Sequence, residues 1–216
     1  MEIVLKRFLI IAIFAALAVV LMGADSSCDT KKNSAPSNTT TSATPAPQQT
    51  APVVQEDKYP HFKDGNYVVG TDIQPGTYRT RSSSSGCYYA RLSGFGGSLD
   101  EILANENANG PAVITIAPTD KGFKSARCGT WTQDLSAITT SQTSFSDGIY
   151  IVGTDIQPGT YKSTGGSGCY YSRLSGFTGT LDDILANENT DGVAIVTIAG
   201  SDAGFKSARC GTWNKT

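Results

Sequence analysis

Hydrophobic residues follow three different patterns along this chain. Residues 8–22 form an unbroken apolar run, residues 29–56 are mostly polar, and from residue 62 onward the apolar residues come in short runs. These short runs are rich in Tyr, Val, Ile and Thr and are separated by Gly, Pro, Asn and Asp, which is typical of β-strands joined by turns. The pattern predicts an N-terminal apolar segment, a polar connector and a β-rich remainder.

The β-rich remainder is a tandem repeat. The stretch VGTDIQPGTY at residues 69–78 recurs unchanged at residues 152–161, and GFKSARCGTW at residues 122–131 recurs at residues 204–213. Self-similarity at a fixed period indicates one structural unit that is present twice. We therefore predict two domains, at residues 57–131 and 145–216, joined by a linker at residues 132–144.

Turn-forming residues divide each repeat into predicted strands. In the first repeat the strands are expected at residues 67–70, 77–80, 87–92, 112–117 and 123–130. Pro75-Gly76 suits the central positions of a type II turn, and Asn109-Gly110 suits a two-residue hairpin turn. Residues 99–107 fit either a helical turn or a strand.

Differences between the two repeats support the predicted strands and turns. Asp191-Gly192 replaces Asn109-Gly110 and is also favoured in hairpin turns. Ile195 replaces Val113, which keeps the β-branched, apolar character that a strand with one buried face requires.

Four of the five cysteines occupy matching positions in the two repeats, which predicts the disulfides Cys87–Cys128 and Cys169–Cys210. Each pair would close a loop of about 40 residues, worth on the order of 4 kcal/mol in the chain-entropy model. This is a large contribution to stability, because a domain of this size has only a small hydrophobic core of its own. The two cysteines of each pair are far apart in sequence, unlike the Cys-x-x-Cys of redox motifs, so we expect structural disulfides. We predict an all-β fold, with two tandem β-sandwich-like domains that are each stapled by a disulfide.

The N-terminus has the features of an export signal. Lys6 and Arg7 precede the apolar run, and the run is short for a membrane span. The following polar segment, residues 29–56, is rich in Ser, Thr and Pro and is predicted to be a disordered tether. Both repeats are therefore expected outside the cytoplasm.

The fifth cysteine, Cys28, stands directly after small residues that follow the apolar run. Bacterial lipoproteins are cleaved and acylated at a cysteine in this position, although Asp25 stands where such a site usually has Leu. Three fates of the segment at residues 1–28 stay open: lipidation at Cys28, which we favour, cleavage without a lipid, and retention as an uncleaved anchor. Lipidation or retention would make the membrane a partner of the protein.

Charge and metal-ligand patterns narrow the range of partners. The 17 basic and 19 acidic residues are balanced, and no basic stripe occurs in either repeat, so nucleic-acid binding is not expected. Residues 105–110 and 187–192 follow the opening of an EF-hand loop. However, Ile116 and Ile198 stand where that loop needs a bidentate Glu. We therefore predict neither a metal site nor a cofactor.

Catalytic patterns are also missing from the sequence. A Ser-His-Asp system needs a histidine, and the single histidine, His61, precedes the first repeat and has no counterpart in the second. The adjacent carboxylates Asp100 and Glu101 are expected on a solvated turn, because neighbouring side chains rarely face each other as an acid–base pair. We do not expect an enzyme.

Paired tyrosines are the best candidates for ligand binding. Two consecutive tyrosines follow the first cysteine of each repeat on a predicted strand, so they should face opposite sides of the sheet. One should join the core, and the other should face out near an arginine, where it could stack on a sugar or grip a peptide. The alternative is that both are covered. The candidate binding residues are Tyr88, Tyr89, Arg91, Tyr170, Tyr171 and Arg173.

The order VGTDIQPGTY, CYYARLSGF, ILANEN and GFKSARCGTW resembles a small repeat of uncharacterised secreted proteins and lipoproteins from Gram-positive bacteria, especially actinobacteria. The resemblance covers both repeats. It implies an envelope location and a disulfide-stapled β domain, and it implies no established activity.

The sequence thus predicts an exported, lipid-anchored protein of the cell envelope. Its two non-catalytic repeats would bind a cell-wall or other extracellular ligand. The alternatives are a structural spacer without a ligand and an extracytoplasmic enzyme.

Overall fold

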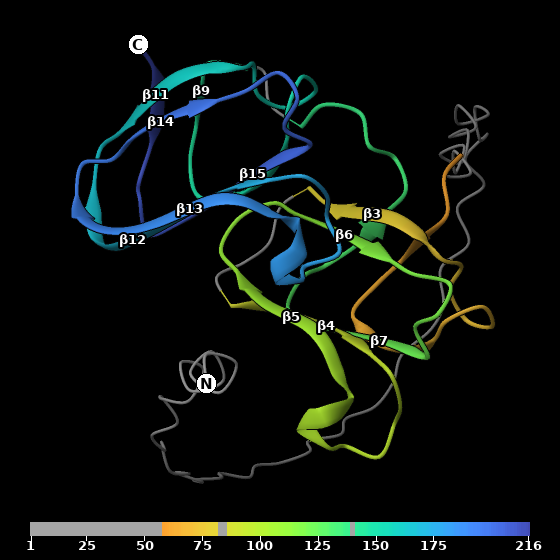
Figure 1. The fold of residues 1–216 in the computed structure, drawn as a ribbon. Helices are drawn as coiled ribbons and strands as arrows, with labels where there is room; N and C mark the ends of the chain where they lie inside the picture. Colours follow the sequence, from red (N-terminus) through yellow and green to blue (C-terminus); the bar gives the residue numbers. More distant parts are fainter. Residues whose placement is uncertain (1–57, 82–85, 139–140) are drawn as a thin grey trace, which may run out of the picture. The chain divides into compact units, whose positions relative to one another are not determined.

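Strands dominate both repeats in the computed structural model, which describes residues 58–81, 86–138 and 141–216 (Figure 1). The predicted export segment, Cys28 and the predicted tether lie outside the described residues. Within those residues, no helix has the length and apolar character needed to cross a membrane.

Eight strands build each repeat. The first repeat contains β1 His61–Phe62, β2 Gly65–Val68, β3 Gly76–Thr80, β4 Cys87–Leu92, the 3-10 helix η1 Leu99–Glu101, β5 Ile102–Ala108, β6 Ala112–Ile116, β7 Gly122–Ala126 and β8 Trp131–Thr132. The second contains β9 Ser144–Phe145, β10 Gly148–Ile151, β11 Gly159–Ser163, β12 Gly166–Leu174, the 3-10 helix η2 Leu181–Asp183, β13 Ile184–Gly192, β14 Ile195–Ile198, β15 Gly204–Ala208 and β16 Trp213–Lys215.

The strands of each repeat form two antiparallel four-stranded sheets. In the first repeat the orders are β1-β8-β3-β6 and β2-β7-β4-β5, and the second repeat has the corresponding orders β9-β16-β11-β14 and β10-β15-β12-β13. Consecutive strands change sheet except at β4–β5 and β12–β13. This is the strand order of a jelly roll, a double-sheet architecture built from two Greek keys. The predicted all-β class with two sandwich-like domains is therefore confirmed.

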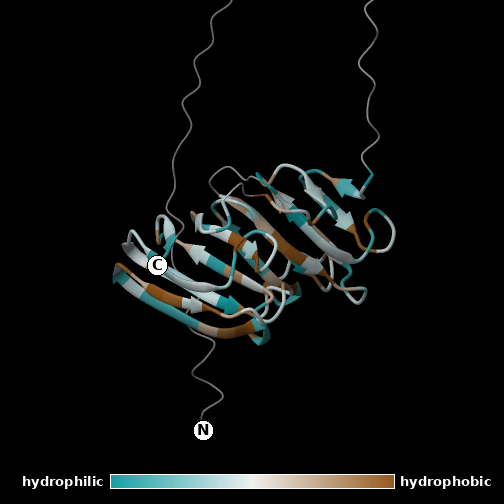
Figure 2. Cartoon of the chain, turned by 90° about the horizontal axis from the view of Figure 1, so that it is seen from above, coloured by the Kyte–Doolittle hydropathy of each residue, from teal (hydrophilic) through white to brown (hydrophobic). Residues whose placement is uncertain are grey.

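An aromatic cluster fills the space between the two sheets of each repeat. In the first repeat, Tyr78, Phe123 and Trp131 are buried, and the rings of Phe123 and Trp131 meet edge to face with centroids 5.7 Å apart. The indole N–H of Trp131 donates to Ser125 Oγ at 2.8 Å, which satisfies its buried polar group. In Figure 2, many of the hydrophobic residues, coloured brown, lie on the strands.

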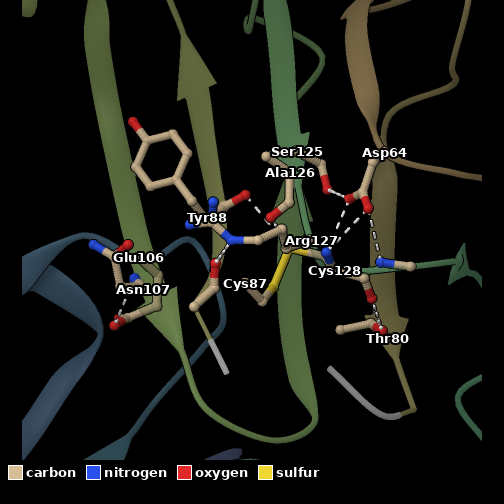
Figure 3. The surroundings of a disulfide bond; sticks show 12 residues. Asp64, Thr80, Cys87, Tyr88, Glu106, Asn107, Ser125, Ala126, Arg127 and Cys128 are labelled. Atoms are coloured by element: carbon tan, nitrogen blue, oxygen red, sulfur yellow. Dashed lines mark hydrogen bonds between the residues drawn. A yellow bond between two sulfur atoms is a disulfide. The ribbon is translucent and has the colours of Figure 1, made fainter. Parts of the chain in front are cut away.

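The disulfides pair Cys87 with Cys128 and Cys169 with Cys210, as the cysteine positions predict. Cys87 begins β4 and Cys169 lies within β12, and each is joined to the loop that follows the neighbouring strand of its sheet, β7 or β15. Asp64 lies beside the first disulfide (Figure 3), where its carboxylate accepts hydrogen bonds from Ser125 Oγ and from the amide of Cys128. Burial opposes ionisation of Asp64, but these bonds outweigh it and lower its pKa.

The predicted hairpin at Asn109-Gly110 is wrong. Strands β5 and β6 belong to different sheets, so the dipeptide carries the chain from one sheet to the other. Its counterpart Asp191-Gly192 lies at the end of β13, where Gly192 pairs with Gly166. Local turn chemistry could not reveal this, because a dipeptide that permits positive φ serves either kind of connection.

The predicted type II turn at Pro75-Gly76 is also wrong. Gly76 has φ +150° and is the first residue of β3, which lies in the opposite sheet from β2. The chain reverses earlier, where the carboxylate of Asp72 accepts the Val68 N–H at 2.8 Å. The ambiguous residues 99–107 contain both expected conformations, since the turn of η1 leads directly into β5.

Candidate functional site

The paired tyrosines divide between the inside and the outside of each sandwich. Tyr89 and Tyr171 point inward and are buried, whereas Tyr88 and Tyr170 lie on the outer face and are half-buried. Figure 3 shows the ring of Tyr88 pointing away from the disulfide. Burial raises the pKa of Tyr171 to about 12, helped by its hydrogen bond to Glu188 at 2.5 Å. The inner tyrosines are core residues. Of the outer ones, Tyr88 lines an open groove, whereas Tyr170 is covered by the first repeat.

The arginines do not lie beside the outer tyrosines, which corrects our expectation. Arg91 is three positions from Tyr88, and an odd spacing on a strand places two side chains on opposite faces. Its guanidinium instead holds Asp120 with contacts of 2.7 and 2.8 Å. Arg173 makes the same paired contacts with Asp202, and this lowers the pKa of Asp202.

Two lysines, which the sequence analysis missed, take the place expected for the arginines. Lys124 Nζ lies 6.0 Å from the centroid of the Tyr88 ring, and Lys206 Nζ lies 5.4 Å from that of Tyr170. Both distances suit a cation–π contact. The lysines sit on β7 and β15, the sheet neighbours of β4 and β12. Both lysines lie in the stretch GFKSA, which occurs in each repeat. This recurrence could point to the lysines only once it is known that β7 and β15 pair with the tyrosine strands.

The outer face of the first repeat carries an open groove of about 410 Å³ beside Tyr88. We call it the Tyr88 groove, and we define it by Asn66, Tyr88, Leu92, Phe95, Glu101 and Lys124. The ring of Phe95 is 56% exposed there. The groove therefore offers the apolar side chain of Leu92, two aromatic rings and a cation to whatever binds it.

Glu101 shapes the wall of this groove. Its carboxylate accepts the amide N–H groups of Gly96 and Gly97 at 3.0 and 2.8 Å, and its carbonyl oxygen accepts the amide of Ser93 at 2.8 Å. In the second repeat, Asp183 likewise accepts the amide of Gly179 at 2.9 Å. These acidic residues fix the loop before β5 and β13.

The corresponding groove of the second repeat is covered by the first repeat. We call it the Tyr170 groove, and we define it by Ile149, Tyr170, Leu174, Phe177, Asp183 and Lys206. Only about 60 Å³ of space remains in it. The covering surface, which we call the β5–β6 edge, consists of Ala104, Glu106, Pro111, Val113 and Thr115.

Backbone hydrogen bonds and ion pairs fasten this contact. The Thr115 N–H donates to the Phe177 carbonyl at 2.7 Å, and the Ile149 N–H donates to the Pro111 carbonyl at 2.8 Å. Lys206 forms an ion pair with Glu106. Ile149 and Leu174 also belong to the hydrophobic core of the first repeat. The two repeats thus share one packed junction.

A second ion pair across the junction is fully buried. Arg79 Nη2 lies 2.5 Å from Asp155 Oδ2, and neither side chain is exposed to solvent. Arg79 also donates to the Ser136 carbonyl at 2.8 Å, while Asp155 accepts the Ile138 N–H at 3.2 Å. The linker therefore closes over the pair and supplies hydrogen bonds to both of its charges.

The Tyr88 groove is suited to binding by stacking, apolar contact and charge. Both oxygens of Glu101 already accept backbone amides, so this carboxylate serves the loop. Within residues 58–81, 86–138 and 141–216, no group of three His, Cys, Asp or Glu side chains could hold a metal ion.

Comparison with known proteins places the chain in a family. The model of the Rv1352-like extracellular domain matches residues 60–132 and again residues 142–214. The chain belongs to this family. The family's description as an extracellular domain places both repeats outside the cytoplasm.

The chain is also similar to mycobacterial proteins that are described as uncharacterized. The uncharacterized protein Rv1352 of Mycobacterium tuberculosis (strain ATCC 25618 / H37Rv) is 33% identical over 81 residues, which is 32% of this chain and 66% of the relative. The uncharacterized protein Mb1387 of Mycobacterium bovis matches to the same extent. The family thus supplies a location and no ligand.

Proposed function

We propose that the protein is an exported, non-catalytic binding protein of the cell envelope, and that its binding site is the Tyr88 groove. One observation carries this proposal: the matching groove of the second repeat holds a protein surface. Tyr170 and Lys206 lie under the β5–β6 edge, and Tyr88 and Lys124 repeat them in an open groove. The same side chains on the same scaffold are therefore available for a partner.

The exposed groups of the groove favour an occupant with both apolar and acidic groups. Phe95 and Tyr88 offer ring surface to apolar or planar groups, and Lys124 offers a positive charge beside them. Aromatic rings provide large contact areas at low entropic cost, so they commonly dominate binding surfaces. A spacer without a ligand would leave this groove exposed to solvent in the envelope.

Amine labelling of intact cells tests whether the groove is occupied. The full-length protein would be labelled on its host's surface and, separately, after purification at high dilution, followed by peptide mass spectrometry. Lys124 should be protected on cells and reactive in the dilute protein. Lys63, which is exposed away from the groove, should react equally in both samples and serves as the control.

Lys206 provides the protected reference, because it already forms an ion pair with Glu106 within the chain. Equal reactivity of Lys124 on cells and in dilute solution would overturn the proposed binding role. That result would favour the structural spacer.

A further inference from the structure

We propose that the occupant of the Tyr88 groove is a second copy of this chain. In this arrangement the second repeat of one copy covers the first repeat of the next, just as the first repeat covers the second within each copy. The inference rests on the proposed binding role of the groove. It follows from comparing the junction inside the chain with the surfaces that the chain leaves exposed.

The second repeat exposes the counterpart of the surface that fills the Tyr170 groove. We call it the β13–β14 edge, and it consists of Ala186, Glu188, Val193, Ile195 and Thr197. Val113 is 2% exposed in the junction, whereas its counterpart Ile195 is 63% exposed. Val193, the counterpart of Pro111, is 51% exposed. The β13–β14 edge thus presents apolar side chains to solvent, and on the groove side Asn66 stands where the junction has Ile149.

Charge is complementary in both ion pairs that a second junction would contain. Glu188 and Lys124, the counterparts of Glu106 and Lys206, are both exposed. Lys162 and Asp72 are also exposed, and they correspond to Arg79 and Asp155, the buried pair of the junction. Lys replaces Arg at one position, so the opposite signs are kept in both pairs. Complementary charge at matched positions favours correct docking over other contacts.

The second repeat also has a backbone edge that corresponds to the one used in the junction. Strand β6 is an edge strand of its sheet, and its Thr115 N–H donates to the second repeat. Strand β14 is likewise an edge strand, and Thr197 occupies the position of Thr115. Edge strands present backbone donors and acceptors that favour association. Docking would place Thr197 against the carbonyl of Phe95.

A glycine leaves room for the incoming edge. A Cβ added at Gly179 would lie 3.3 Å from both Ala104 Cβ and Ile114 Cδ1, so Gly179 allows the close approach inside the chain. Its counterpart Gly97 has φ +82°, and nothing lies within 4 Å of a Cβ added there. The Tyr88 groove therefore keeps the same gap, and it is open.

Such an association is head-to-tail, because the groove and the edge are different surfaces. Each added copy exposes a new edge, so the contact can be repeated along a row of copies. Within one chain the linker holds the repeats at an effective concentration of roughly millimolar order. Between free copies the contact would be weaker, and copies crowded on one surface would favour it.

Sedimentation velocity of the full-length protein in mild detergent tests the inference. The wild type should grow from monomer to larger species as its concentration rises toward about 1 mM, the scale set by the linker. Ile195→Lys should remain monomeric, because it places a charge in the apolar contact. A wild type that stays monomeric across this range would overturn the inference.

Leu185→Lys is the matched control. Leu185 lies on β13 and is 52% exposed, and its counterpart Leu103 remains 43% exposed although its own strand is docked. This position is therefore outside the junction, and the variant should associate like the wild type. Equal loss of association in Leu185→Lys and Ile195→Lys would contradict the proposed geometry.

A charge exchange separates docking from folding. Lys124→Glu and Glu188→Lys should each weaken association, and the double variant should regain it because the pair is restored with reversed signs. Glu188 also accepts the Tyr171 O–H, but the single variant Glu188→Lys and the double variant lose this bond alike. A double variant that stays monomeric would contradict the pairing.

The two proposals can fail separately. Lys124 protected on cells, together with a protein that is monomeric at every concentration, would retain the binding role and exclude a second copy as the occupant. Co-sedimentation with purified cell-wall material, lost in Phe95→Ala, would then identify the wall as the partner. Lys124 reactive on cells would overturn both proposals.

Discussion

At the scale of the residue, equivalent side chains in the two repeats have different environments. Arg79 is fully buried against Asp155, whereas its counterpart Lys162 is exposed. Val113 and Ile195 differ in the same way. Their positions along the strands are the same, so the docking of the repeats makes the difference.

Replacing Arg79 with Met should lower the free energy of unfolding by about 3 kcal/mol, because Asp155 would stay buried without its charged partner. Urea denaturation monitored by tryptophan fluorescence would measure the change. Lys162→Met is the matched control, and it should change stability by less than about 0.5 kcal/mol as an exposed substitution. Equal effects of the two variants would contradict the difference in burial.

The tyrosine and arginine positions show what a local pattern can predict at this scale. Period-two alternation correctly predicts that the two tyrosines face opposite sides of the sheet, and the structure shows that Tyr89 is the inward one. The same rule, applied to Arg91, would have placed it with Tyr89. Lys124 could not be found in this way, because it reaches Tyr88 from a neighbouring strand that is distant in sequence.

At the scale of the element, the disulfides connect strands that already pair in one sheet. Tyr88, directly after Cys87, lies opposite Ala126, and Cys128 follows β7. The bond therefore fixes β4 to β7 beside the Tyr88 groove. The disulfide and the Tyr88 groove therefore involve the same two strands.

Replacing Cys87 and Cys128 together with Ala should lower the free energy of unfolding by on the order of 4 kcal/mol, from the entropy regained by the unfolded chain. Calorimetry of the variant against the oxidised wild type would measure it. The pair Cys169 and Cys210 has the same sequence separation of 41 and should give a similar loss. A loss below about 1 kcal/mol for either pair would contradict this account.

At the scale of the whole molecule, the described repeats form a joined pair. Ile149 and Leu174 of the second repeat belong to the hydrophobic core cluster of the first. An isolated first repeat would expose its β5–β6 edge, and an isolated second repeat would expose the Tyr170 groove. The family's extracellular description fits the predicted export segment, and anchoring through Cys28 remains our prediction.

Changing Cys28 to Ala should move the protein from the membrane fraction to the soluble extracellular fraction, because a lipid can no longer be attached there. Fractionation and immunoblotting of host cells would measure this. Unchanged retention in the membrane would contradict lipid anchoring and indicate that the apolar run is kept as the anchor.

The sequence by itself determined the duplication, the strand-rich composition, the pairing of the cysteines and the two faces of each tyrosine strand. These features follow from local patterns and from comparing one copy with the other. Only the tertiary structure decided the jelly-roll order, because the pairing of β2 with β7 or β3 with β8 joins residues far apart in sequence. Only the tertiary structure also showed that the Tyr170 groove is covered and the Tyr88 groove is open. Tyr, Leu, Phe and Lys recur in both grooves, while Asn66 and Glu101 stand in the first where Ile149 and Asp183 stand in the second. What packs against each groove decides whether it is covered.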